Sequence, residues 1–209
     1  MKDNFINLQL DDLDFDFNLE PDNDSNKFIK LENHNIKNKD VFYQNAQKLA
    51  HDIHIKRGDC VYVNLAGNFI FGDFIGAFIT CNSLDVEELT VISLSGAIDN
   101  YEMLNELMIN GYVEKINLVL SKYYLRTEQK KHSRTIEFLS QLIELHNGKF
   151  NVYYADNHSK SVLIKTKKGG HVTMHGSANL RSSTNIEQMI IQENKDLYDF
   201  NYSFFKNLI

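Results

Sequence analysis

The chain has 209 residues, of which 43% are hydrophobic and 11% aromatic, enough for one substantial core and too few for two comfortable ones. Its two cysteines, Cys60 and Cys81, both lie inside apolar runs, which argues against a disulfide framework and favours a reduced, cytoplasmic protein. The N-terminal residues lack the pattern of a signal peptide, and no apolar run approaches the roughly 18 residues of a membrane span. We therefore expect no export and no membrane partner.

The formal net charge of −6 is concentrated near the N-terminus. Residues 1–26 hold eight acidic residues against one lysine, a charge of −7, which leaves the remaining 183 residues at +1. This composition predicts an acidic, disordered or docking arm and linker over 1–40, followed by one domain over 41–209. Apolar and acidic residues alternate from Asp12 to Leu19, as in a half-buried strand. The arm is therefore either a solvated tail or a docking peptide for a protein partner or for a basic groove of its own body.

From residue 41 on, segments with helical spacing of apolar residues alternate with short β-branched runs. The first half of this region is predicted to form helices over 41–55, 72–83 and 101–110 and strands over 60–66, 89–95 and 115–121. Asp99 and Glu102 have the spacing of a capping box for the third helix, which should end at Gly111.

The second half continues the same alternation. It is predicted to contain a basic loop over 122–132, a helix over 133–148, strands over 150–155 and 186–192, and a final helix near 197–208. Between the last two strands lies a hairpin that turns at Lys167–Gly170. Regular alternation of this kind predicts an α/β fold whose mixed, largely parallel sheet is flanked by helices on both faces.

The hairpin carries the strongest chemical signal. In a strand, residues two apart share a face, so His158 and Lys160 are predicted to point the same way. An imidazole beside an ammonium can attack phosphorus while the lysine neutralises the phosphoryl oxygens. Ser177 and Asn179, again two apart, offer donors to those oxygens, and Glu187 can hold one ring nitrogen of His158 so that the other is the nucleophile. The alternative is a basic hairpin in which Gly-Ser is only a turn.

These residues carry a family resemblance. His158-x-Lys160, then Gly176–Asn179 (GSAN), then Asn185–Glu187 (NIE) resemble the HKD signature of the phospholipase D superfamily, and the resemblance covers roughly residues 41–209. It implies a phosphodiesterase or nuclease that needs no metal and no cofactor. Single-motif relatives of this kind often serve phage or defence biology.

Enzymes of this family use two histidines, one to attack phosphorus and one to protonate the leaving oxygen, and this chain has one copy of the motif. The resemblance therefore implies a homodimer in which two copies of His158 share one site. His171 and His175, in the same hairpin, are the alternative second acids. One departure stands out: the family's usual Asp, five residues beyond the motif lysine, is Lys165 here. With a lysine at this position there are three alternatives. The protein is an active enzyme, its site has added affinity for phosphate, or it is a catalytically degenerate binding or assembly protein that docks through its acidic arm.

The substrate is predicted from charge. Basic residues around the motif and in the loop over 122–132, together with Tyr123 and Tyr124, suit the phosphates and bases of DNA or RNA better than a lipid headgroup. The alternative is an ordinary solvated surface. The predicted nucleic-acid-binding residues are Lys165, Lys167, Lys168, Arg181, Arg126, Lys130 and Lys131.

Overall fold

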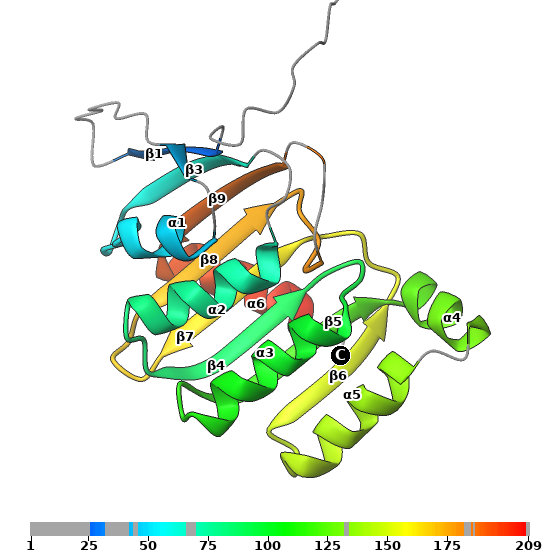
Figure 1. Ribbon diagram of the computed structural model, residues 1–209. Helices are drawn as coiled ribbons and strands as arrows, with labels where there is room; N and C mark the ends of the chain where they lie inside the picture. Colours follow the sequence, from blue (N-terminus) through cyan, green and yellow to red (C-terminus); the bar gives the residue numbers. More distant parts are fainter. Residues whose placement is uncertain are drawn as a thin grey trace, which may run out of the picture.

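The computed structural model describes residues 26–31, 42–43, 46–65, 70–131, 134–181, 185 and 187–207. The alternating segment of the predicted arm lies outside these residues. Figure 1 shows one twisted sheet with helices packed on it. In chain order the elements are β1 (Asn26–Leu31), β2 (Phe42–Tyr43), α1 (Ala46–Asp52), β3 (Cys60–Leu65), α2 (Phe71–Cys81), β4 (Val86–Ile92), α3 (Ile98–Ile109), β5 (Val113–Ser121), α4 (Lys122–Lys130), α5 (Arg134–Leu145), β6 (Phe150–Ala155), β7 (Ser161–Thr166), β8 (His171–Gly176), β9 (Glu187–Glu193) and α6 (Lys195–Lys206).

The sheet is mixed, and its strand order is β2-β1-β3-β9-β8-β7-β4-β5-β6. The α/β class is confirmed, but the expectation of a largely parallel sheet is wrong. Among the described strands, only β4, β5 and β6 pair in parallel, and the other pairings are antiparallel. Parallel neighbours need a long crossover, which α3, α4 and α5 supply, whereas short turns such as Lys167–Gly170 join antiparallel strands. Helices alternate with strands in the first half of the chain, but among the described residues no helix separates the strands β7, β8 and β9 that follow β6.

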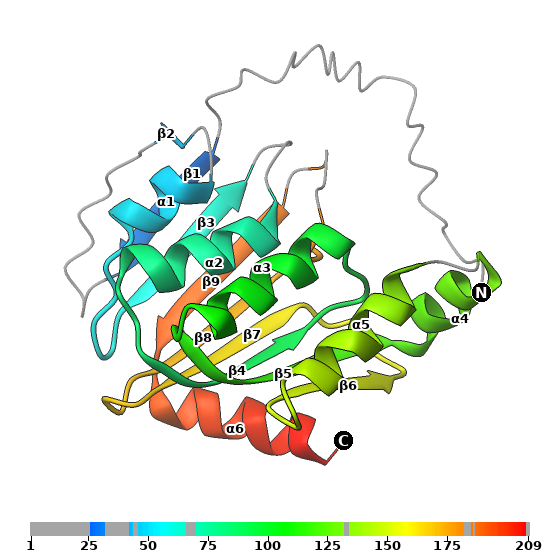
Figure 2. The same cartoon turned by 60° about the horizontal axis from the view of Figure 1, so that its bottom comes forward.

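Helices cover both faces of the sheet, as expected. Figure 2 shows α1, α2, α3 and α5 on one face and α6 on the other. Successive side chains of a central strand point to opposite faces of the sheet, so each strand contributes to both layers. In β7, Val162 and Ile164 join the main core under α2 and α3. Leu163 joins a smaller cluster with Tyr198 and Phe205 of α6. The sheet is thus buried on both sides at its centre.

Four elements differ from expectation. Residues 42–43, predicted to begin the first helix, form the short strand β2, and that helix spans only Ala46–Asp52. Residues 122–130 form a helix, α4, because the Ser121 side chain caps it by accepting a hydrogen bond from the Tyr124 amide at 2.9 Å. Helix α3 begins one turn early, and Asn100 rather than Glu102 reaches back to the chain before the helix, accepting from the Ala97 amide at 2.9 Å. Residues 26–31 pair with β3 as a strand of the sheet, so the domain includes part of the predicted arm and linker.

The strand register brings several strand ends to one edge of the sheet, called here the site edge. Ser161 at the start of β7 pairs with Ile92 at the end of β4 and with His175 near the end of β8. Glu187 at the start of β9 pairs with Leu65 at the end of β3. The carboxyl ends of the parallel strands β4, β5 and β6 therefore meet the loops before β7 and after β8, which is where open α/β sheets usually bind ligands.

Candidate active site

The predicted nucleophile lies in a loop rather than in a strand. His158 and Lys160 belong to residues 156–160, between β6 and β7. The loop is held by Asn157, whose side-chain oxygen accepts from the Ser159 amide at 2.8 Å and whose Nδ2 donates to the Ser93 carbonyl at 3.4 Å. Asn157 favours such a turn because its short amide competes with regular backbone pairing. His158 is therefore exposed at the site edge on a locally fixed turn.

Lys160 contacts His158 directly. Its Nζ lies 3.1 Å from His158 Nδ1 and donates to the His158 carbonyl at 2.8 Å. Burial lowers the pKa of Lys160, an effect that the nearby Glu187 carboxylate opposes. An ammonium can only donate, so Nδ1 accepts and a neutral His158 ring carries its proton on Nε2. The structure thus pairs the two motif residues through Nδ1 of the His158 ring.

Ser177 and Glu187 form the second part of the site. The Ser177 hydroxyl donates to Glu187 Oε2 and accepts from the Gln188 amide at 3.0 Å. The Gly176 amide donates to the Lys160 carbonyl at 3.1 Å, which places the Gly-Ser step beside the loop of His158. Glu187 therefore orients Ser177 and adds negative charge beside Lys160.

Asn179 completes the motif on a segment fixed by its neighbours. Ala178 and Leu180 are buried, and the Leu180 backbone bonds to Ser93 Oγ at 3.3 Å and to the Gly72 amide at 2.9 Å. The Oδ1 atom of Asn179 is buried and has no hydrogen-bond partner among the described residues. Buried polar atoms are rarely left unpaired, and as an amide oxygen this atom would accept a hydrogen bond.

Of the two alternative histidines, His171 lies far from the site edge, and His175 lies at it but on the α6 side of the sheet. His171 sits at the far end of β8, where its ring contacts Tyr198 and the Gly169 carbonyl. His175 Nδ1 pairs with the Ser161 hydroxyl at 3.1 Å, and burial lowers the pKa of His175. Because Met174 points into the main core, His175 faces the α6 side of the sheet. Neither histidine lines the cavity beside His158.

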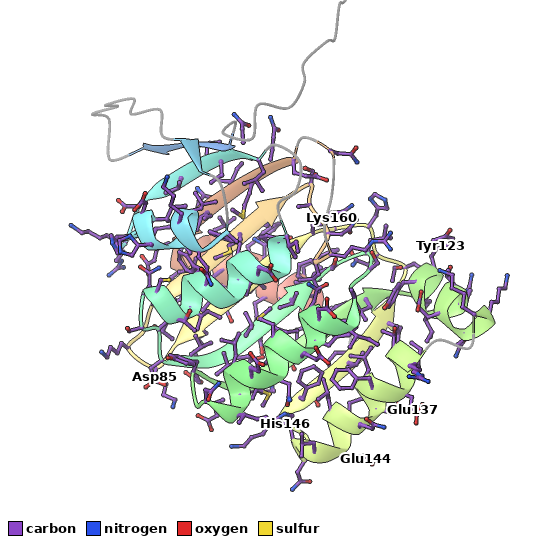
Figure 3. The ribbon with its side chains drawn as sticks, viewed as in Figure 1. Asp85, Tyr123, Glu137, Glu144, His146 and Lys160 are labelled. Atoms are coloured by element: carbon purple, nitrogen blue, oxygen red, sulfur yellow. The ribbon has the colours of Figure 1, made fainter. Side chains whose placement is uncertain are left out.

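The predicted nucleic-acid-binding residues fall into two groups. Lys165 of β7 pairs with Glu87 at 2.7 Å, and Lys167 pairs with Asp85 at 3.0 Å; Lys168 is in the same turn. Figure 3 shows Asp85 at the end of the sheet opposite Lys160. The structure therefore does not bring Lys165, Lys167 and Lys168 together with His158.

The second group lies near the site. Arg126, Lys130 and Lys131 are exposed on α4 and just after it, and Arg181 is exposed after the Asn179 segment. Burial raises the pKa of Tyr124, and the charge of Arg181 partly offsets this effect, which places Arg181 on the α4 side. Lys122, at the start of α4, pairs with Asp156 at 3.0 Å.

A cavity of about 380 Å³ opens beside the predicted nucleophile. It is lined by Leu94, Ser121, Tyr123, Asp156, Asn157 and His158. Sequence reasoning named Tyr123 and His158 but missed the other four. Asp156 and Asn157 stand directly before the motif, and their turn-forming character was a usable signal. Leu94 and Ser121 come from distant strand ends and carried no local signal.

Because Lys165 is remote from the site, it should not control activity. It lies four residues beyond Ser161 along β7, about 13 Å away. We expect Lys165→Met to keep turnover within about twofold and to lower the free energy of unfolding by about 0.2–1 kcal/mol, the usual worth of a partly exposed ion pair. Lys165→Asp, which restores the family's residue, should lose more stability beside Glu87 and gain no turnover. Phosphodiesterase assays and urea unfolding check this, and higher turnover in Lys165→Asp would contradict it.

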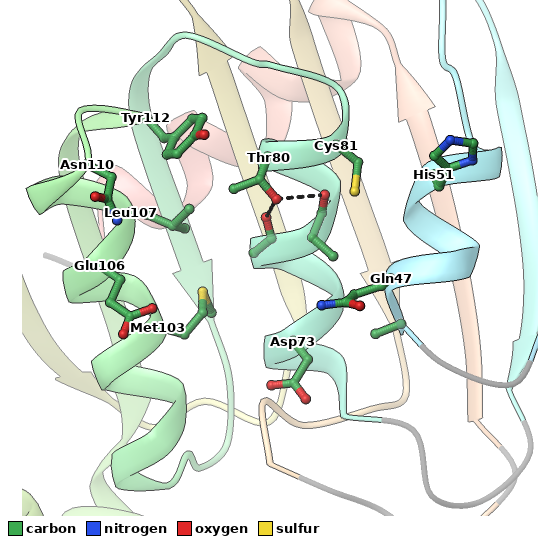
Figure 4. A pocket seen from close by; sticks show the side chains of 13 residues that line it. Gln47, His51, Asp73, Thr80, Cys81, Met103, Glu106, Leu107, Asn110 and Tyr112 are labelled. Carbon is green, nitrogen blue, oxygen red and sulfur yellow. Dashed lines mark hydrogen bonds between the residues drawn. The ribbon is translucent and has the colours of Figure 1, made fainter.

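A larger cavity of about 650 Å³ lies away from this chemistry. Figure 4 shows it between α1, α2 and α3, with Asp73, Glu106 and His51 around its rim. Burial raises the pKa of Asp73, assisted by Asp99. None of the HKD-like motif residues lines this cavity.

No group of three or more His, Cys, Asp or Glu side chains among the described residues could hold a metal ion. No helix in this part of the chain has the length and apolar character needed to cross a membrane.

Comparisons with known proteins bear on the fold. No family model and no curated protein matches the sequence. Among solved structures, polyphosphate kinase from Porphyromonas gingivalis matches with a TM-score of 0.51 and 12% identity, over 71% of this chain and 26% of that chain. Nuc from Salmonella typhimurium, a phospholipase D family member, matches with a TM-score of 0.42 and 14% identity, over 58% and 77%. Yeast tyrosyl-DNA phosphodiesterase matches with a TM-score of 0.38 and 15% identity, over 63% and 31%.

These identities bear on the fold alone. The chain spans about a quarter of the length of the polyphosphate kinase that it matches. At this level the chain shares the fold of the matched part of the polyphosphate kinase.

Proposed function

We propose that the protein is a metal-independent phosphodiesterase that cleaves nucleic acid through a phosphohistidine intermediate. One observation carries the proposal: the His158–Lys160 pair and the Ser177–Glu187 pair come from three separate segments and meet at the site edge, next to the segment that holds Asn179. Solved structures with similar folds include a polyphosphate kinase and a DNA phosphodiesterase, which supports phosphoryl transfer as the class of reaction.

The chemistry follows from the donors at the site. A phosphoryl oxygen is a stronger acceptor for Lys160 than a neutral imidazole, so a bound phosphodiester draws the ammonium away from His158 Nδ1. The ring is then free to exchange its proton and attack. A bond forms between a ring nitrogen and phosphorus, and the bond to the leaving oxygen breaks. Lys160 and the Asn179 Nδ2 supply donors to the phosphoryl oxygens as charge develops, and the Ser177 hydroxyl joins them by turning from Glu187 to the phosphate.

The second proton donor comes from another copy of the chain in this proposal. His158 is the only histidine among the described residues that line the cavity, and His175 is engaged with Ser161 on the other sheet face. His158 of a second copy protonates the leaving oxygen. It then takes a proton from the water that attacks phosphorus and breaks the bond to the first histidine. Such a dimer has one shared site on its two-fold axis.

The acidic arm joins the sheet near this site. Lys27 of β1 pairs with Asn64, which pairs with Gln188, the neighbour of Glu187. The first strand therefore begins at the site edge, two strands away from Glu187. This position is compatible with docking of the preceding acidic residues on the basic surface of α4.

Cleavage in the presence of a chelator tests the proposed function. The protein is incubated with single- and double-stranded DNA and RNA in excess EDTA, and the products are separated on denaturing gels. We expect cleavage of at least one substrate and a covalent phosphoprotein that is labile to acid, as phosphohistidine is. Binding without cleavage of any substrate would reject the enzyme and favour a degenerate nucleic-acid-binding protein with the same fold.

A further inference from the structure

The structure separates two neighbouring tyrosines that the sequence leaves equivalent. Tyr124 is buried, and its hydroxyl donates to the Gly96 carbonyl at 3.0 Å and pairs with Tyr101 at 3.3 Å. Tyr123 is 72% exposed and lines the cavity beside His158. Figure 3 shows Tyr123 on the same side of the molecule as Lys160. One tyrosine therefore holds α4 in place, and the other presents its ring to the site.

The position of Tyr123 is fixed although its side chain is exposed. It is in the first turn of α4, next to the Ser121 cap, and its carbonyl accepts from Thr127 Oγ1 at 2.9 Å. Its hydroxyl makes no hydrogen bond with any residue that the structure describes. An exposed aromatic ring with two rotatable bonds on a capped helix loses little entropy when a ligand packs on it. This arrangement is typical of a stacking platform rather than of a core residue.

We propose that Tyr123 stacks on an unpaired base of the nucleotide next to the scissile phosphate, so that the protein acts on single-stranded nucleic acid. The inference rests on the proposed function, whose phosphate position at His158 sets the position of the neighbouring base. A cavity of about 380 Å³ is near the lower limit for small-ligand sites. It has room for one nucleoside-sized group. A base within a duplex is stacked on its neighbours and offers no free face to Tyr123.

The remaining walls of the cavity indicate tolerance of base identity. Leu94 adds apolar surface. The polar side chains are already engaged: Asp156 with Lys122, Asn157 with Ser93 and Ser159, and Ser121 with the Leu94 carbonyl. Bases are told apart by hydrogen bonds to their edges, whereas every base has a face for stacking. The cavity therefore favours any unpaired base over a particular one.

The basic residues of α4 support a nucleic acid over a lipid. Residues 121–134 hold five basic residues against one acidic residue, a net charge of +4. The exposed ones, such as Arg126 and Lys130, continue along the helix from Tyr123, which suits the repeating phosphates of a strand that leaves the cavity. The described residues around the cavity include one exposed aromatic ring but no extended apolar surface of the kind that enters a membrane.

Binding of a labelled oligonucleotide tests the inference apart from catalysis. The full chain carrying His158→Ala is titrated in EDTA against a fluorescein-labelled 12-nucleotide oligothymidylate, its duplex with oligoadenylate, and an analogue in which abasic residues replace the nucleotides. Fluorescence anisotropy gives Kd. We expect the single strand to bind more tightly than the duplex and the abasic analogue. Adding Tyr123→Ala should weaken binding of the single strand by about 5- to 150-fold, the loss of one base–aromatic stack, and Tyr123→Phe should leave it unchanged.

Phe200 provides a matched control, because it is equally exposed at 72% and lies on α6, on the opposite face of the sheet. Phe200→Ala should not change Kd. Equal binding by Tyr123→Ala, an equal loss in Tyr123→Phe, or undiminished binding of the abasic analogue would overturn the inference. Tyr123-dependent binding to anionic phospholipid vesicles without oligonucleotide binding would do the same. Tyr123-dependent oligonucleotide binding in a wild-type protein that cleaves nothing would reject the proposed hydrolysis but keep the stacking of Tyr123 on an unpaired base.

Discussion

His158→Ala is expected to lower phosphodiester cleavage by at least about 10³-fold while leaving the fold intact. The substitution removes both the nucleophile and, in a dimer, the proton donor, and acid–base catalysis alone typically contributes about 10²- to 10⁴-fold. The side chain is exposed on a loop, and its ring contact is with the flexible Lys160. The free energy of unfolding should therefore change by less than about 0.5 kcal/mol. Initial rates on a chromogenic diester and on oligonucleotides, with urea unfolding on the same samples, measure both quantities.

The matched control for this experiment is His171→Ala. His171 belongs to the same hairpin but sits at the opposite edge of the sheet, against Tyr198. Its removal should leave turnover within about twofold. Loss of activity in His171→Ala together with normal activity in His158→Ala would mean that the motif histidine is not the nucleophile. Unchanged cleavage in both variants would point to a contaminating nuclease.

The spacing of the motif predicted which residues lie together better than apolar periodicity predicted the sheet. The motif residues His158, Lys160, Ser177 and Glu187 come from neighbouring segments of the sequence. The structure brings them to one edge of the sheet. Whether two strands pair parallel or antiparallel depends on which strands become neighbours in the sheet. The spacing of apolar residues along the chain does not report this. The strands β4, β5 and β6 are joined by helices and gave parallel pairs, whereas the similar apolar runs of β7, β8 and β9 formed antiparallel hairpins. The sequence pattern alone therefore could not predict the proportion of parallel strands.

Charge along the sequence was a poor guide to the binding surface. Lys165 and Lys167 are only five and seven residues beyond Lys160, yet a strand carries them to the far edge, where Glu87 and Asp85 neutralise them. Proximity in sequence is not proximity in space when the intervening residues are extended by about 3.3 Å each. In contrast, α4 was predicted as a loop because its residues are polar, and its cap at Ser121 was the signal that was missed.

A heterodimer of one wild-type and one His158→Ala subunit is expected to be nearly inactive. If two copies of His158 share one site, the heterodimer keeps one histidine and lacks either the nucleophile or its acid partner. Its turnover should then fall by about 10²- to 10⁴-fold. Two independent sites would instead retain half of the wild-type activity, because one of them is intact. Co-expression of the two subunits with different affinity tags, followed by tandem purification, gives the heterodimer for direct assay.

The same purification provides a control, and it can also give a result that rejects the shared site. A heterodimer of wild-type and His171→Ala subunits should keep full activity, which excludes damage by the tags or by the purification. Half activity in the His158 heterodimer would show that each chain carries a complete site, and the second proton donor would then have to come from within the chain, with the Ser161–His175 pair as the first place to look. Failure to recover any heterodimer, with a monomeric and active wild-type protein, would lead to the same conclusion. The assay thus separates a site that needs two chains from one that is complete in a single chain. Loss of one histidine removes more than half of the activity only if the two chains share one site.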